Sequence, residues 1–99
     1  IRTAANTGAE DDPNLDNIGV NKDIYDAYLE GYLSTATFLT ELEKSLLPYG
    51  CKRMSFMQAV RFYIDYLNGD TYYKIAYPEH NLVRTKAQIR LFEEQRKCL

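Results

Sequence analysis

The chain of 99 residues has a mass of 11.5 kDa and a formal net charge of −2, which is enough for one small domain. Its composition, 45% hydrophobic and 26% charged, is that of a globular protein and excludes a disordered or fibrous chain. No run approaches the roughly 18 apolar residues of a membrane span, so no membrane partner is expected. The two cysteines, Cys51 and Cys98, are too few for a disulfide framework, and we expect free thiols in the cytoplasm.

The charge is unevenly distributed along the chain. Residues 1–50 hold nine acidic and three basic side chains, whereas residues 51–99 hold nine basic and five acidic ones. Either the two halves attract each other as they pack, or the second half presents a basic surface to phosphate or nucleic acid. The basic residues are spaced along helices rather than clustered, which favours the first interpretation, so no nucleic-acid partner is expected.

Residues 1–22 form the first predicted unit, a loop-rich N-terminal segment with asparagine, glycine and proline throughout. Its acidic run, Glu10 to Asp12, is predicted to be a surface turn, because three consecutive carboxylates point in different directions and cannot share a cation. Residues 23–99 form the second unit, a helical subdomain. Its first helix is predicted to begin near Asn21 or Asp23, since either side chain can accept hydrogen bonds from the free amides of a first turn.

The next helical signals run from Thr40 to Leu67. Thr40 to Glu43 form a capping box, and Pro48 and Gly50 are expected to end or bend the helix that starts there. From about Lys52 onward, apolar residues cover most of a helix circumference. The polar residues of this helix form a narrow stripe: Gln58, Arg61, Asp65 and Asn68. An amphipathic surface helix has the reverse proportion, so this helix is predicted to be central and nearly surrounded.

Gly69 is predicted to end this helix in the left-handed conformation. Residues 71–78 are predicted to be an extended, aromatic-rich connection, because a strand here has no second strand to pair with. The last helix is predicted from about His80 or Asn81 to Lys97. The sequence thus predicts an all-α fold, a small bundle of three to four helices behind a loop-rich N-terminus.

Arg61 and Asp65 lie four residues apart on the polar stripe and can pair on one helix face. The pair is either a structural ion pair on an apolar helix or a guanidinium held ready for ligand hydroxyl or carboxylate groups. Taken alone, the first interpretation is favoured, because such pairs are common structural devices. Tyr72 follows the same helix and can approach the same space, with an apolar ring face and a polar tip of the kind that faces carbohydrates.

The remaining candidates for chemistry are few. His80 is the only histidine and has no partners at metal-ligand spacing, so a helix cap or a hydrogen bond to a loop is expected. The chain contains no Ser-His-Asp order, glycine-rich phosphate loop or paired-cysteine motif, and no catalytic or metal-binding residue is assigned. Cys51 is expected to be a small core residue and Cys98 an exposed thiol.

Two sequence blocks resemble a known family. Residues 61–74 read Arg-Phe-Tyr-Ile-Asp-Tyr-Leu-Asn-Gly-Asp-Thr-Tyr-Tyr-Lys, and residues 77–84 read Tyr-Pro-Glu-His-Asn-Leu-Val-Arg. Together they resemble the C-terminal end of bacterial sugar kinases of the aminoglycoside phosphotransferase superfamily, specifically those similar to N-acetylhexosamine 1-kinases. Ile1-Arg2 and Ala9-Glu10-Asp11 resemble the family's segment after its metal-binding Asp motif, and the chain departs from the pattern at Tyr63-Ile64, where Leu-Thr is common. Proteins of this group also carry the name mucin desulfatase, although no sulfatase nucleophile motif occurs here.

The resemblance implies that residues 23–99 belong to a kinase-like C-lobe. The parent protein would transfer the γ-phosphoryl group of ATP, with Mg²⁺, to the anomeric hydroxyl of an N-acetylhexosamine. The family's catalytic base, metal-binding Asp and ATP-holding N-lobe lie upstream of Ile1, so we expect a piece of a longer protein that is not catalytic alone. The family's sugar-contacting Arg and Tyr match Arg61 and Tyr72, and Asp65 would then hold Arg61 in its working rotamer.

The partners expected from the resemblance are the sugar and the remaining kinase lobes of the same chain. The alternative, from another class of function, is a free-standing helical protein-interaction module that binds a partner or itself. The apolar excess of the last two helices predicts self-association of the chain in either case.

Overall fold

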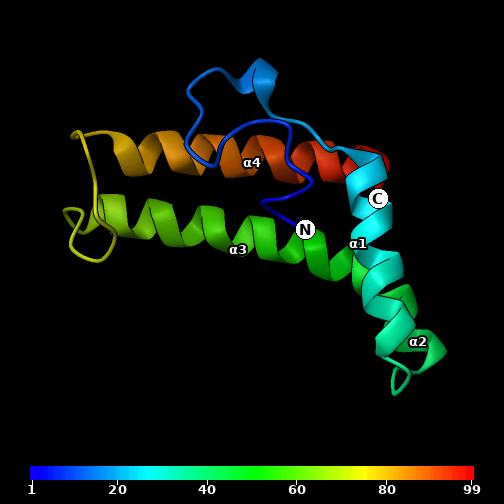
Figure 1. Cartoon of the computed structure of the whole chain (residues 1–99). Coiled ribbons are helices and arrows are strands. Elements are labelled where there is room, and N and C mark those ends of the chain that lie inside the picture. The colour runs from blue at the N-terminus through cyan, green and yellow to red at the C-terminus, as the bar shows by residue number, and fades with distance from the viewer.

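The computed structural model describes all 99 residues and confirms the all-α fold. Its elements are a short 3-10 helix, Leu15–Asn17, and four α-helices: α1 (Lys22–Thr35), α2 (Glu41–Ser45), α3 (Leu47–Leu67) and α4 (His80–Cys98). Helices α3 and α4 lie side by side as an antiparallel hairpin, closed at one end by residues 68–79 (Figure 1). Helix α1 leaves the other end of the hairpin and leads to α2, away from α4 (Figure 1). No helix is both long and apolar enough to cross a membrane.

The N-terminal segment is loop-rich, as predicted, and it packs along α4 rather than standing apart (Figure 1). A single antiparallel bridge joins Asn6 to Val20, and the amide of Thr7 donates to the carbonyl of Gly19 over 3.1 Å. Ile18, in the second of these two loop stretches, is buried against Ala87 and Leu91 of α4. This cluster is the largest apolar core of the molecule.

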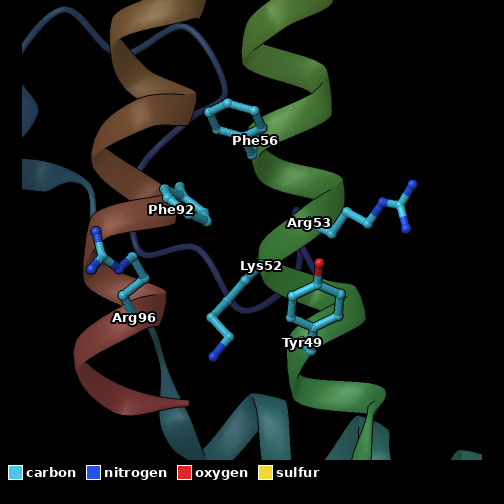
Figure 2. Close-up of a pocket in the computed structure, with 6 residues that line it drawn as sticks. All are labelled: Tyr49, Lys52, Arg53, Phe56, Phe92 and Arg96. Atoms are coloured by element: carbon cyan, nitrogen blue, oxygen red, sulfur yellow. The ribbon is translucent and has the colours of Figure 1, made fainter. Parts of the chain in front are cut away.

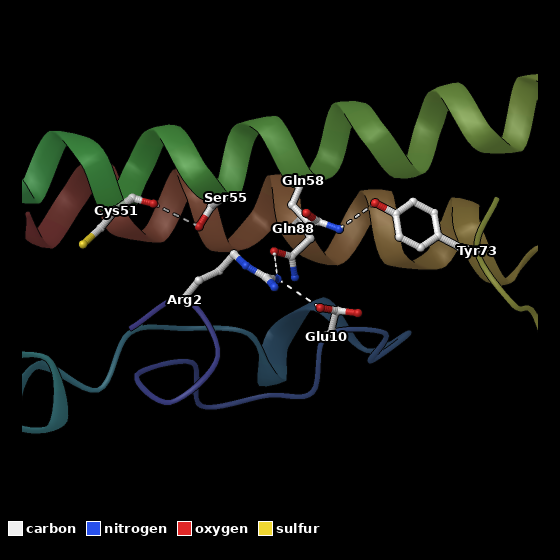
Figure 3. A network of polar contacts seen from close by, with 7 residues as sticks. All are labelled: Arg2, Glu10, Cys51, Ser55, Gln58, Tyr73 and Gln88. Carbon is white, nitrogen blue, oxygen red and sulfur yellow. Dashed lines mark hydrogen bonds and ion pairs between the residues drawn. The ribbon is translucent and has the colours of Figure 1, made fainter. Parts of the chain in front are cut away.

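Arg2 fastens the same segment to α4 by hydrogen bonds (Figure 3). Its guanidinium donates to Oε1 of the buried Gln88 over 2.9 Å and to Oε2 of Glu10 over 3.0 Å. One acid of the predicted acidic turn is therefore paired within the segment. Asp12 is also used locally, because its carboxylate accepts from the amide of Asn14 over 2.9 Å.

The predicted helix starts are confirmed by their capping contacts. The Asn21 side chain accepts from the amide of Ile24 over 3.2 Å at the start of α1. At α2, the Thr40 hydroxyl accepts from the Glu43 amide, and the Glu43 carboxylate accepts from the Thr40 amide, both over 3.1 Å. Helix α3 starts at Leu47, earlier than expected, because Pro48 occupies its first turn, where no amide donor is needed.

The prediction that the third helix is nearly surrounded is wrong. Only four residues of α3 are buried: Ser55, Ala59, Phe62 and Asp65. Helix α4 contacts one side of α3, while the N-terminal segment covers α4, so the opposite side of α3 stays open. The exposed apolar residues of α3, on this side and at its edge with α4, include Met54, Phe56, Val60, Tyr63, Ile64 and Leu67.

Helices α1 and α2 are weakly anchored. Tyr25 is the one buried residue of α1, and α2 has none. Several large apolar side chains here face solvent, among them Phe38 at 75% and Leu42 at 70% exposure. Ala36, directly after α1, is also buried, so this part of the molecule has two buried residues and is otherwise held by local hydrogen bonds.

Candidate functional site

The candidate site is an open cleft of about 420 Å³ at the closed end of the α3–α4 hairpin. The chain reverses there through Gly69 and Asp70, whose φ angles of 88° and 59° are left-handed. This reversal brings residues 68–79, called here the connection, back over the last turns of α3. The cleft is lined by Arg61, Ile64, Asp65, Asn68, Thr71, Tyr72 and Tyr73. Both predicted substrate-binding residues, Arg61 and Tyr72, thus line the same cleft.

The Asp65 carboxylate organises the connection. It is buried and accepts hydrogen bonds from the amide of Tyr72 over 2.7 Å, the amide of Tyr73 over 3.0 Å and Nδ2 of Asn81 over 2.7 Å. Burial raises the pKa of the Asp65 carboxyl, but these three donors outweigh burial and leave the pKa below its ordinary value. Asp65 is therefore an ionised acceptor that fixes the backbone at Tyr72.

The predicted ion pair between Arg61 and Asp65 does not form. Arg61 is exposed and makes no hydrogen bond or ion pair with any side chain. The spacing of four residues does put both on the cleft. However, the backbone amides of the connection occupy the carboxylate, and the guanidinium stays free. Asp65 consequently positions Tyr72 rather than Arg61.

Tyr73 holds the connection from the other side. Its ring packs on the buried Phe62, with ring centroids 4.8 Å apart, and its hydroxyl accepts from Nε2 of Gln58 over 3.2 Å (Figure 3). The Tyr72 ring stands edge-on to Tyr73 at 4.9 Å and is 82% exposed. The backbone of Tyr72 is therefore fixed while its ring and hydroxyl remain available to a ligand.

Two residues of α4 that the sequence did not mark as functional complete this arrangement. Asn81 bridges Asp65 and Asp70, donating to the Asp70 carboxylate over 3.0 Å. Arg84 donates to Oδ1 of Asn81 over 2.9 Å and to the carbonyl of Lys74 over 3.1 Å. Both belong to the block of residues 77–84 on which the family resemblance rests, and that was the only signal available for them.

The predicted hydrogen bond between His80 and a loop is confirmed. Its Nδ1 accepts from the amide of Ala76 over 3.1 Å, so Nε2 carries the proton and donates to Asp11 over 2.7 Å. This hydrogen bond lowers the pKa of the Asp11 carboxyl below its ordinary value. The Tyr77 ring stacks on the imidazole at 4.6 Å. His80 thus ties the N-terminal segment to the connection.

Neither cysteine is placed as a nucleophile. Cys51 is half-buried, and burial raises the pKa of its thiol, which keeps the thiol protonated near neutral pH. Cys98 is exposed, as predicted. No group of three or more His, Cys, Asp or Glu side chains could hold a metal ion.

The cleft presents groups that can bind a ligand. A free guanidinium and a phenol can donate to vicinal hydroxyl groups, and the exposed Tyr72 ring offers an apolar face to a sugar ring. No protein-family model matches the chain.

Proposed function

We propose that this chain is the substrate-side C-terminal helical subdomain of an ATP-dependent sugar kinase that acts on an N-acetylhexosamine. In this function Arg61 and Tyr72 bind the sugar. The base, the metal ligands and the nucleotide-binding lobe belong to the remainder of a longer parent protein. ATP and Mg²⁺ are accordingly cofactors of the parent and not of these 99 residues.

The observation that carries this proposal is the position of Arg61 and Tyr72 on one open cleft. They come from different elements, α3 and the connection after it, and they meet because Asp65 fixes the Tyr72 backbone. The free guanidinium is the second supporting feature, since a donor already paired with a carboxylate would have fewer N–H groups left for a ligand.

A free-standing helical interaction module is the second candidate function. The observation that favours it is the number of large apolar side chains that face solvent on α1, α2 and the open side of α3. In this function the two candidate residues have no ligand role, and the exposed apolar surfaces bind a protein.

The sugar-kinase proposal is tested on the full-length parent with ATP, Mg²⁺ and a panel of N-acetylhexosamines. We expect ADP release with formation of a sugar phosphate from one of them. Arg61→Ala should raise the KM for that sugar by about tenfold or more, because it removes a charged hydrogen-bond donor, and should leave the KM for ATP near the wild-type value.

The matched control is Arg53→Ala, which removes another exposed arginine of α3 that lies outside the cleft. Its sugar KM should stay at the wild-type value. An unchanged sugar KM in Arg61→Ala would contradict the assignment of the cleft. No turnover on any sugar, together with no nucleotide binding, would favour the interaction module instead.

A further inference from the structure

A second concave surface lies at the open end of the α3–α4 hairpin, whereas the Arg61–Tyr72 cleft lies at its closed end. This groove has a volume of about 330 Å³. Its lining, called here the basic groove, consists of Tyr49, Lys52, Arg53, Phe56, Phe92 and Arg96. Phe56 of α3 and Phe92 of α4 face each other across it, with ring centroids 5.4 Å apart (Figure 2). The groove therefore combines an aromatic floor with three cations.

None of these three cations takes part in an ion pair of the chain. Residues 45–64 include Lys52, Arg53 and Arg61 and contain no acid at all. The nearby Glu94 is paired with Arg90 and Lys97 and does not neutralise the groove. An unpaired basic surface around aromatic rings calls for an anionic, partly apolar occupant.

The arrangement of the charges favours an extended occupant over a single anion. In Figure 2 the Lys52 ammonium lies between the two helices, whereas Arg53 and Arg96 extend to opposite sides. In this arrangement the three charged groups point apart and do not form one site of the size of a phosphate or carboxylate group. They can each meet a separate carboxylate of a polypeptide that crosses the groove while one of its apolar side chains packs on the Phe56–Phe92 pair.

The same chain carries a segment of this complementary character. It comprises Phe38, Glu41, Leu42 and Glu43 and is called here the α1–α2 tip. Phe38 and Leu42 are 75% and 70% exposed, and the Glu41 side chain is 92% exposed. Glu41 has one partner, Lys44, at 3.3 Å, an exposed pair of little energetic weight. The tip thus presents two large apolar side chains flanked by two carboxylates.

We propose that the α1–α2 tip of one copy docks into the basic groove of a second copy of this chain. Each copy offers both surfaces, and a reciprocal exchange that closes as a two-fold dimer satisfies both of them at once. Apolar contact between Phe38 or Leu42 and the Phe56–Phe92 pair supplies the attraction, and the carboxylates meet the unpaired cations.

The charges also argue against a dimer formed by the open apolar sides of two α3–α4 hairpins. Lys86 lines the apolar strip that continues from the groove and is likewise without an ion pair. Such a dimer would bring Lys52, Arg53 and Lys86 close to the same cations of the partner copy, and like charges in contact oppose association. Docking of the acidic tip removes this repulsion. The proposal does not depend on sugar binding, because the two sites share no residue.

A charge-swap experiment on the 99-residue chain tests the proposal. Analytical ultracentrifugation at low salt should show a reversible dimer of the wild-type chain. The tip variant Glu41→Lys/Glu43→Gln and the groove variant Lys52→Glu/Arg53→Glu should each weaken association by about tenfold or more. Glutamine at position 43 retains the acceptor of the capping box, so the fold of α2 is preserved.

Mixing the two variants in equal amounts should restore a dimer near wild-type affinity. In that pair each reversed tip meets a reversed groove, and each native tip meets a native groove. Lys74→Glu reverses an exposed cation at the far end of the hairpin and should dimerise like the wild type. A wild-type chain that stays monomeric at high concentration would overturn the proposal. So would a dimer whose affinity is unchanged in both variants, or a mixture that fails to reassociate.

Discussion

A single carboxylate, that of Asp65, joins three parts of the molecule at the candidate cleft. It belongs to α3, accepts the amides of Tyr72 and Tyr73 in the connection, and accepts Nδ2 of Asn81 on α4. Hydrogen bonds to an ionised acceptor are stronger than those between neutral groups. The position of Tyr72 therefore depends more on this buried acid than on any contact of its own ring.

Asp65→Asn should lower the free energy of unfolding at pH 7 and speed amide exchange at Tyr72 and Tyr73. The amide side chain keeps one acceptor oxygen, but its NH₂ group faces a donor, so one N–H loses its partner. The pKa of Asp65 is depressed in the folded chain, so its stabilisation is present above the ordinary value of 3.8 and is lost as pH falls further.

Urea unfolding of both proteins at pH 7 and at about pH 2 measures this effect. The difference between wild type and variant should be large at neutral pH and should shrink as the pH falls below 3.8 and the wild-type carboxylate takes up its proton. Asp16→Asn, at an exposed acid whose carboxylate forms no hydrogen bond or ion pair, serves as the control and should change little. Equal stability of Asp65→Asn and wild type at neutral pH would contradict the role given to this acid.

At the scale of elements, the four helices are stabilised in two different ways. Helices α3 and α4 pack on each other along their length, whereas α1 has one buried residue and α2 has none. Short helices without a packed face are marginal in water. The caps at Asn21 and Thr40 therefore matter more for α1 and α2 than comparable caps do for well-packed helices.

Asn21→Ala should destabilise α1 locally by about 1 kcal/mol, because it removes the acceptor for the Ile24 amide. Amides in the first turns of α1 should then exchange about fivefold faster, while those in the middle of α3 keep the wild-type rate. Hydrogen exchange followed by NMR gives both rates in one experiment. Equal acceleration in α1 and α3 would mean that α1 unfolds only together with the rest of the chain.

The same contrast explains what the sequence could predict. Caps are local, so Asn21 and Thr40 could be identified from their neighbours alone. The excess of apolar residues in α3 predicted a surface that has to be buried. It did not show whether other parts of this chain bury that surface. At the cleft, the turn at Gly69 was enough to expect Arg61 and Tyr72 near each other. The partners of Asp65 were missed because two of them are backbone amides, which leave no signature in a sequence.

At the scale of the whole molecule, the N-terminal segment completes the core. The chain extends over 44 × 25 × 20 Å, and its buried apolar cluster consists of Ile18 from that segment with Ala87 and Leu91 from α4. Gly8 is required for this packing, since a Cβ there would lie 2.8 Å from Cδ1 of Ile18. Arg2 and Asp11 add polar contacts to α4 at Gln88 and His80. The N-terminal segment therefore supplies part of the interior against which α4 packs.

Ile18→Ala tests this view most directly, since it removes the side chain that the segment inserts against α4. Truncation of a buried isoleucine leaves a cavity and should cost about 2–4 kcal/mol, a large fraction of the stability of a domain this small. Leu15→Ala, in the same segment but 36% exposed, should cost far less. Urea unfolding followed by far-UV circular dichroism compares the two. If the segment were only loosely attached to α4, both variants would unfold at the wild-type urea midpoint. The expected large loss in Ile18→Ala alone would mean that the helical hairpin requires the N-terminal segment to fold.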